Sequence, residues 1–275
     1  MPLVINTNVG SLNAQRYLAN NTNALSKTME KLASGYRINR ASDDAAGLAV
    51  SEKMRTQIRG SQKALDNTQD GINMLNIADG TLQAVTDSLQ RMRELSVQSA
   101  NDSYSTAQRS AMQNEYDQLA SGIVQMAKAS QFNGIHLLDG TTTTFTLQIG
   151  ANTTTGVDDL DIASALSNVS TLATTGTLDA HANAVSAIST IDTAINTINT
   201  QRGKLGAFVN RLEYTASNLS TNIENTSSSE SRVRNVDVAM ESANLARNQI
   251  LQQASSAMLS QANQAPQLAL QLLRG

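Results

Sequence analysis

The sequence predicts a mainly α protein, built as a long helical coiled-coil bundle with a small β-hairpin region. Residues recur at alternating three- and four-residue steps from Ile188 to Ile223, and Arg202 is the one polar member of an otherwise apolar series. This spacing is typical of helices that pack along one another. Proline occurs only at positions 2 and 266, so the strongest helix breaker is absent between them. Aromatic residues make up 3% of the chain, fewer than a globular enzyme usually places in its core and pocket.

The N-terminal segment predicts an amphipathic helix, because Leu18, Leu25 and Leu32 are each one heptad apart. A linker is expected at residues 34–43, where a glycine and strand-tolerant residues interrupt the helical period. A second helix should begin at residues 42–44, a Ser-Asp-Asp run of the residue types preferred at helix N-caps.

Two more apolar lines precede residue 130, separated by the turn-forming residues 101–103. The first is about as long as the 188–223 series, which favours side-by-side packing of three helices in one bundle. The two lines consist of Ile58, Leu65, Ile72, Leu75, Leu82, Val85, Leu89 and Met92, and of Met112, Tyr116, Leu119, Ile123 and Met126.

The pattern changes after Gln131. Asn133-Gly134 is a dipeptide typical of tight hairpin turns. Apolar and polar residues alternate at 145–149, which predicts a strand. Residues 141–179 are rich in Thr, Gly, Asn and Ser, so we expect a small β element followed by loops.

The C-terminal segment is again amphipathic, and its apolar line continues almost to the last residue. Chain ends usually fray unless they are docked, so this line implies a partner for the helix. Its members are Leu251, Ala254, Met258, Ala265, Leu268 and Leu272.

Several classes of function are not supported by these residues. The chain has no cysteine, which excludes disulfides and thiolate chemistry. Its two histidines lack metal-ligand spacing. Gly203-Lys204 lacks the sequence context of a phosphate-binding loop. Gly203 is instead expected to permit close approach of another helix. A net charge of −3 does not favour nucleic acid, and no apolar run is long enough for membrane insertion. We therefore expect no catalytic, cofactor-binding or metal-binding residues, and no enzyme.

Motifs at both ends and in the middle point to one family. They are MEKLASGYRINRASDDAAGLAVSEKMRTQIRG near the N-terminus, NTQDGINMLNIADGTL, LQRMRELSVQSAN, QFNG and FTLQIGAN in the middle, and SRVRNVDVAMESANLARNQILQQASSAMLSQANQAPQLALQLLRG at the C-terminus. In this order they resemble the bacterial flagellins over most of the chain. Only about residues 141–180 are available where many flagellins carry outer domains, so the resemblance is to a short form with core domains only.

The resemblance implies a discontinuous organisation. Residues 1–42 and 233–275 would form a terminal coiled-coil domain that lines the inner tube of a filament and drives polymerisation. Residues 43–232 would form the helical core domain, with its β element and loops around 131–180. The polymerisation helices are expected to act through Leu18, Leu25, Leu32, Leu251, Met258, Leu268 and Leu272.

The resemblance also implies a location and partners. The N-terminus lacks the features of a secretory signal peptide, which alone favours the cytoplasm. Flagellins are instead exported by the flagellar type III apparatus, so an extracellular place in the flagellum is expected. The implied partners are other copies of the chain in a homo-polymer, a flagellar secretion chaperone, and the filament cap and hook-associated proteins.

A further implied partner is Toll-like receptor 5. The receptor-contacting residues of the family fall on Arg91, Leu95 and Glu115. Arg91 and Leu95 are four residues apart and are expected to share one helix face; the alternative is that Arg91 is a solvated bundle residue and Leu95 part of the core.

Two alternatives to a filament subunit stay open at this point. A hook–filament junction protein would share the terminal pattern but act as an adaptor. A non-polymerising helical binding module would use the bundle as a scaffold or receptor ligand.

Overall fold

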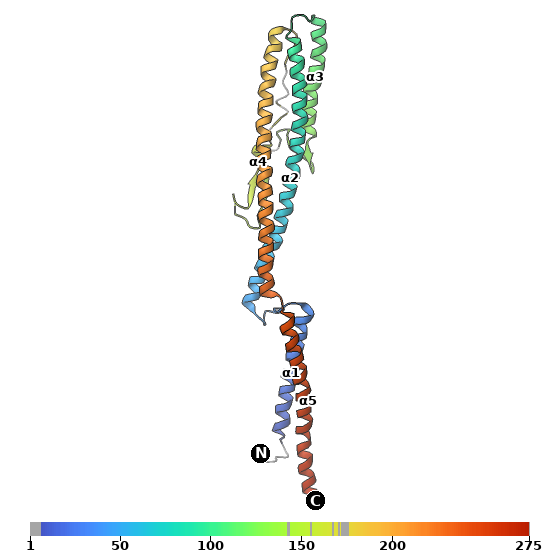
Figure 1. Cartoon of the computed structure of the whole chain (residues 1–275), viewed down its shortest axis with the longest axis vertical. Coiled ribbons are helices and arrows are strands. Elements are labelled where there is room, and N and C mark those ends of the chain that lie inside the picture. The colour runs from blue at the N-terminus through green and yellow to red at the C-terminus, as the bar shows by residue number, and fades with distance from the viewer. Residues whose placement is uncertain are drawn as a thin grey trace. The chain divides into compact units, whose positions relative to one another are not determined.

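The computed structural model describes residues 7–141, 144–154, 156–166, 168–169, 171 and 176–274, with side chains up to residue 264. The described helices are α1 (Val9–Ser34), α2 (Ala45–Ser99), α3 (Thr106–Ala129), α4 (His181–Arg234) and α5 (Val238–Arg274). The strands are β1 (Gln131–Phe132), β2 (Ile135–His136), β3 (Thr146–Gln148) and β4 (Asp159–Asp161), and a short 3-10 helix spans Ala163–Ala165. The predicted mainly α class is confirmed (Figure 1).

The chain divides into two compact units. The terminal unit combines Met1–Thr56 with Thr226–Gly275, and the central unit comprises Gln57–Asn225. Helices α2 and α4 therefore contribute residues to both units.

In the central unit, α2, α3 and α4 lie side by side around one hydrophobic core (Figure 1). All three predicted apolar lines supply buried side chains, so the predicted three-helix packing is confirmed. Fully buried members include Leu75, Leu82, Val85, Leu89 and Met92 of α2, Tyr116 and Ile123 of α3, and Ile191 and Leu212 of α4.

The buried face of α4 is rotated slightly from the predicted line. Ile191 and Ile198 are buried as expected, but the alternate positions lie one residue earlier, at Ala187 and Ala194. The polar residue inside the core is accordingly not Arg202 but Gln201, whose amide donates a hydrogen bond to the backbone carbonyl of Ala165. An amide can be satisfied by one carbonyl in the core, whereas a guanidinium is costly to dehydrate fully.

Arg202 lies at the edge of the same face, where it pairs with an acid of α2. The distance from its Nε to Asp79 Oδ1 is 2.7 Å. Gly203, expected to permit close helix approach, has no atom within 4 Å of the position a Cβ would take. That expectation is wrong, because Gly203 lies on the exposed side of α4.

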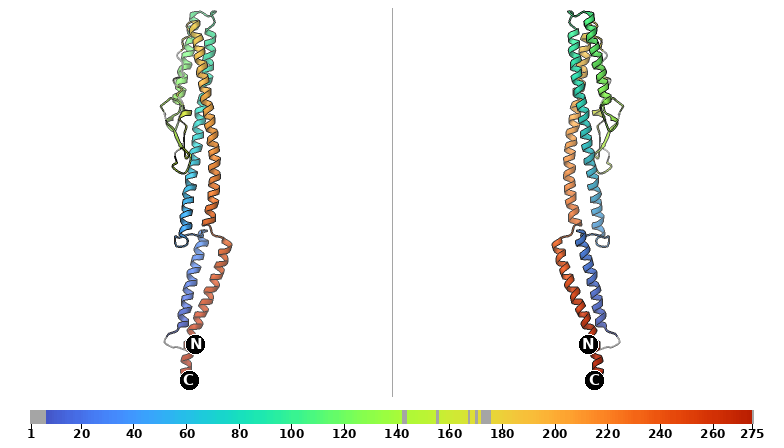
Figure 2. Two further views of the ribbon diagram at one scale, coloured as in Figure 1. Left: turned by 90° about the vertical axis from the view of Figure 1, so that its left-hand side faces the viewer. Right: turned by 90° about the vertical axis from the view of Figure 1, so that its right-hand side faces the viewer.

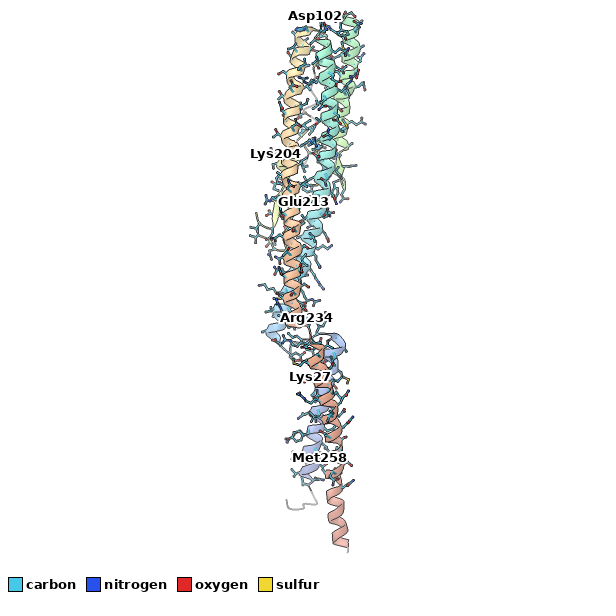
Figure 3. The ribbon with its side chains drawn as sticks, in the orientation of Figure 1. Lys27, Asp102, Lys204, Glu213, Arg234 and Met258 are labelled. Atoms are coloured by element: carbon cyan, nitrogen blue, oxygen red, sulfur yellow. The ribbon has the colours of Figure 1, made fainter. Side chains whose placement is uncertain are left out.

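The turn between α2 and α3 falls where residues 101–103 predicted it. Ser105 caps α3, and its side chain and that of Gln108 form a capping box. Asp102 lies in this turn (Figure 3) and accepts a 3.1 Å hydrogen bond from the nearly buried guanidinium of Arg109. The turn is therefore stabilised by the cap of α3 and by the contact between Arg109 and Asp102.

Two small antiparallel hairpins follow α3. Asn133 and Gly134 join β1 to β2 with φ angles of 50° and 81°, the left-handed conformations that such a tight turn requires. The predicted strand at 145–149 is confirmed as β3, which pairs with β4, a strand within the region predicted as loops. Gly71 of α2 admits this second hairpin, because a Cβ there would lie 2.5 Å from Leu147 Cδ1.

In the terminal unit, α1 and α5 lie side by side and antiparallel, and the views of Figure 2 agree on this. Gly35 ends α1 in the left-handed conformation, with φ of 73°. The predicted linker is confirmed: residues 35–44 are not helical, and Tyr36 pairs with Asn235 in an isolated antiparallel bridge. Asp44 then caps α2 by accepting the backbone N–H of Gly47 at 2.8 Å.

Candidate functional site

The interface between α1 and α5 is more polar than the sequence pattern suggested. On each helix, one line of residues at alternating three- and four-residue steps faces the other helix. We call these two lines together the polar seam. On α1 the line consists of Ser11, Ala14, Leu18, Asn21, Leu25, Thr28 and Leu32, and on α5 of Glu241, Leu245, Asn248, Gln252, Ser255, Leu259 and Ala262; all are buried or half-buried. Among the described side chains of the two helices, Leu25 is the one large apolar group that is buried, with 9% of its surface exposed.

Side-chain hydrogen bonds join the two helices along this seam. Amide and hydroxyl groups form them, so no net charge is buried by these contacts. The donor and acceptor atoms are Asn8 Nδ2 and Ala262 O at 2.7 Å, Ser11 Oγ and Asn263 Oδ1 at 2.7 Å, Asn21 Nδ2 and Ser255 Oγ at 2.8 Å, and Asn248 Nδ2 and Thr28 Oγ1 at 3.1 Å.

Large apolar side chains of the same two helices face outward instead. Met258 is 66% exposed, Tyr17 58% and Leu251 43%; Figure 3 labels Met258 on α5. These three side chains line a groove of about 500 Å³ together with small residues of both helices, and we call it the apolar groove. Its other members are Gly10, Asn13, Ala14, Asn21, Ala254, Ser255 and Ala262. A contiguous exposed apolar surface of this kind is a candidate interaction site.

The residues expected to drive polymerisation thus divide between two surfaces. Leu18, Leu25 and Leu32 lie in the polar seam, whereas Leu251 and Met258 lie in or beside the outward apolar groove. Leu268 and Leu272 belong to α5, but their side chains lie outside the described residues.

The amide and hydroxyl groups of the seam were not predicted. A signal was present in the sequence, since Asn21 and Thr28 stand between the three leucines at three- and four-residue steps. Polar residues at such positions are known to influence register in coiled coils.

The linker of the terminal unit is fixed by Arg234, the last residue of α4. Its guanidinium lies over the ring of Tyr36, 4.7 Å from the centroid, and its Nη1 is 2.8 Å from Glu52 Oε1. Hydrogen bonds from Arg55 and then from Arg234 hold the pKa of Glu52 below its usual value. The backbone N–H of Arg37 also donates to the carbonyl of Arg234 at 2.7 Å. The linker is therefore ordered by contacts with the segment that returns to α5.

The residues expected to contact a receptor do not share one surface. Arg91 Nη2 is 2.9 Å from Glu115 Oε1, and both side chains are about half exposed at the edge of α2 and α3. Leu95 is 2% exposed and packs in the core of the central unit. The burial of the pair agrees with the alternative in which Arg91 is a solvated bundle residue and Leu95 part of the core, because Leu95 continues the buried line that includes Met92.

In the described part of the chain, no group of three or more His, Asp or Glu side chains is placed to hold a metal ion. None of its helices is long and apolar enough to span a membrane. Both histidines make backbone contacts, with the carbonyls of Lys128 and Ala100.

Comparison with known proteins now adds to this picture. The bacterial flagellin N-terminal helical region matches residues 5–143, and the flagellin C-terminal helical region matches residues 188–273. A flagellin of Halalkalibacterium halodurans is 47% identical over 273 residues, which cover 99% of this chain and 100% of that protein. The flagellar filament 33 kDa core protein of Treponema phagedenis is 46% identical, with 99% and 100% coverage.

A solved structure agrees with these matches. The crystal structure of Bacillus cereus flagellin aligns with a TM-score of 0.50 and 30% identity, covering 56% of this chain and 88% of that one. The two relatives match from end to end, which agrees with the short form expected from the sequence. The chain belongs to the bacterial flagellin family and is a structural subunit of the flagellar filament, not an enzyme.

Proposed function

We propose that this flagellin polymerises by burying the apolar groove of its terminal unit against terminal units of neighbouring subunits. Helices α1 and α5 would then line the inner tube of the filament, and the central unit would form the outer tube. The observation that carries the proposal is the outward position of Tyr17, Leu251 and Met258 on helices whose shared interface is about half polar.

Ordering of the terminal unit would be coupled to assembly. Within one chain, Leu25 is the one large apolar side chain buried among the described side chains of α1 and α5, and ordering the two backbones costs conformational entropy. Covering the groove supplies the missing apolar burial only when other copies are present. Head-to-tail repetition of such a contact generates an open helical polymer.

Removing the C-terminal two thirds of α5 tests this proposal. A chain without residues 251–275 loses Leu251 and Met258, while the central unit ends at Asn225 and keeps its core. We expect a soluble protein with the thermal transition of the intact central unit that forms no filaments after seeding. Electron microscopy of long filaments from the truncated chain would contradict the proposal.

Export of the subunit and capping of the filament would both use the weak interaction between α1 and α5. A chain end held by few apolar contacts unfolds readily, which suits passage through the type III apparatus and leaves the apolar line of α5 for a secretion chaperone. The filament cap and hook-associated proteins would offer matching terminal helices at the two ends, and the product would be extracellular.

Recognition by Toll-like receptor 5 is proposed through Arg91 and Glu115. Their ion pair presents a half-exposed guanidinium and carboxylate at the α2–α3 edge, and such groups are suited to an interface. Leu95 would support this surface from beneath without touching a receptor. Reporter-cell signalling by Arg91→Ala at the level of the unaltered protein would count against this part.

A further inference from the structure

We infer that the polar seam fixes the register of α5 against α1 and reserves the apolar line of α5 for other subunits. This inference rests on the proposed assembly through the apolar groove. It assigns a role to the amide and hydroxyl side chains of the seam, two of which, Asn21 and Ser255, also line the apolar groove.

The hydrogen bonds of the seam obey a single antiparallel register. Asn21 bonds to Ser255, and one heptad further along both helices Thr28 bonds to Asn248. Between these two pairs lies Leu25, the buried leucine of the interface. In this alignment both polar pairs form together on either side of the buried leucine.

A shift of one heptad would remove these partners. In one direction the amide of Asn21 would face Ala262. In the other, Asn21 would face Asn248, but Ser255 would face Ala14 and lose its partner. Half-buried polar groups without partners are costly, so the shifted alignments are disfavoured. A single buried Asn has the same effect in coiled coils, where it specifies alignment at a cost in stability.

The seam also separates two faces of α5. Leu251 precedes the seam residue Gln252 by one position, and Met258 precedes Leu259 in the same way. Successive residues point about 100° apart around a helix, so the apolar line and the seam face different directions. If the seam were also apolar, either face of α5 could pack on α1. In part of the molecules Leu251 and Met258 would then be buried against α1, and the groove would not form.

Exchange of one polar pair for leucines tests this role. The double variant Asn21→Leu/Ser255→Leu should show more helix by circular dichroism as a monomer, and its elongation rate on filament seeds should fall at least tenfold. The reciprocal exchange Asn21→Ser/Ser255→Asn keeps an amide opposite a hydroxyl and should elongate within twofold of the unaltered chain. Leucines at the adjacent exposed positions Asn20 and Ser256 are the matched control and should also leave elongation within twofold.

Register can be measured directly, because the chain contains no cysteine. Spin labels on Lys27→Cys and Gln253→Cys report the alignment of α1 and α5, in monomers and in filaments diluted with unlabelled chain. The native seam should give one main distance in filaments. The leucine variant should add a second population displaced by roughly 10 Å, the rise of one heptad.

Two outcomes overturn the inference. One is a leucine variant that elongates at the native rate with the native distance. The other is a control variant or a reciprocal variant that slows as much as the leucine variant. A separate arm, Leu251→Gln/Met258→Gln, tests the proposed function: if that variant assembles normally, the groove is not the assembly surface, whatever the seam variants do.

Discussion

Replacing Leu251 and Met258 by glutamine is the sharpest test of the apolar groove. Glutamine has a helix propensity close to that of leucine and methionine, so α5 should keep its intrinsic tendency to fold. Neither side chain is buried within the subunit, with exposures of 43% and 66%. The substitution should therefore change assembly rather than the fold of the monomer.

The size of the effect follows from the exposed fractions. Full burial of an aliphatic side chain contributes about 1.5–3 kcal/mol. The 66% of Met258 and the 43% of Leu251 that remain exposed then contribute about 1.6–3.3 kcal/mol per subunit when neighbours cover them. That free energy corresponds to a roughly 15- to 250-fold change in an equilibrium constant.

The assay is the critical concentration of seeded polymerisation, measured as the protein left in the supernatant after sedimentation. We expect the glutamine variant to raise this concentration by the factor above. The exchange Leu251→Met/Met258→Leu preserves the apolar character of both positions and serves as the control, with a critical concentration near that of the unaltered chain. If the glutamine variant stays within twofold of the control, the groove is not buried in the filament.

Three more outcomes follow from the structure. Arg91→Ala should leave the free energy of unfolding within about 0.5 kcal/mol but lower receptor signalling, because its side chain is half exposed. Leu95→Ala should cost about 2–5 kcal/mol in chemical denaturation, because Leu95 lies in the core. The backbone N–H of Arg40, opposed in part by desolvation, lowers the pKa of Asp43 below its ordinary 3.8. The ionised carboxylate therefore stabilises the linker above pH 3.8, and this contribution is lost as the pH falls through the lowered pKa. Asp43→Asn should reduce the acid-induced loss of order at residues 35–44, followed by hydrogen exchange, and an unchanged acid dependence would contradict the assignment.

Most of the fold could be predicted because its determinants are local. The spacing of Leu75, Leu82 and Leu89 defines the buried line of α2 without knowledge of its partners. Asn133-Gly134 likewise defines its own turn, since both residues adopt left-handed conformations there. The strand β4 was missed because Asp159–Asp161, although it alternates polar and apolar residues, is only three residues long and rich in Asp, which is rare in strands. It is ordered by pairing with β3.

The candidate site could be predicted only in part, because it depends on which line of a helix meets which neighbour. For α4, the spacing permitted two neighbouring lines, and packing chose the one with Ala187 and Ala194. Small residues there allow the helices to come close, and Ile188 and Ile195 remain half-buried at the edge. Sequence spacing alone does not contain that choice.

For α5 the same ambiguity has a functional meaning. Leu251, Ala254 and Met258 form one line, and Gln252, Ser255 and Leu259 form another with identical steps one residue later. Maximal apolar burial within one chain would turn the first line toward α1, yet the structure turns the second. The hydrogen bonds of Asn21 and Ser255 favour this choice in the single chain, and the apolar line is left in water. Such an arrangement buries its apolar surface fully only when further copies are added. The free energy of burying the apolar line therefore both orders the terminal unit and drives elongation of the filament.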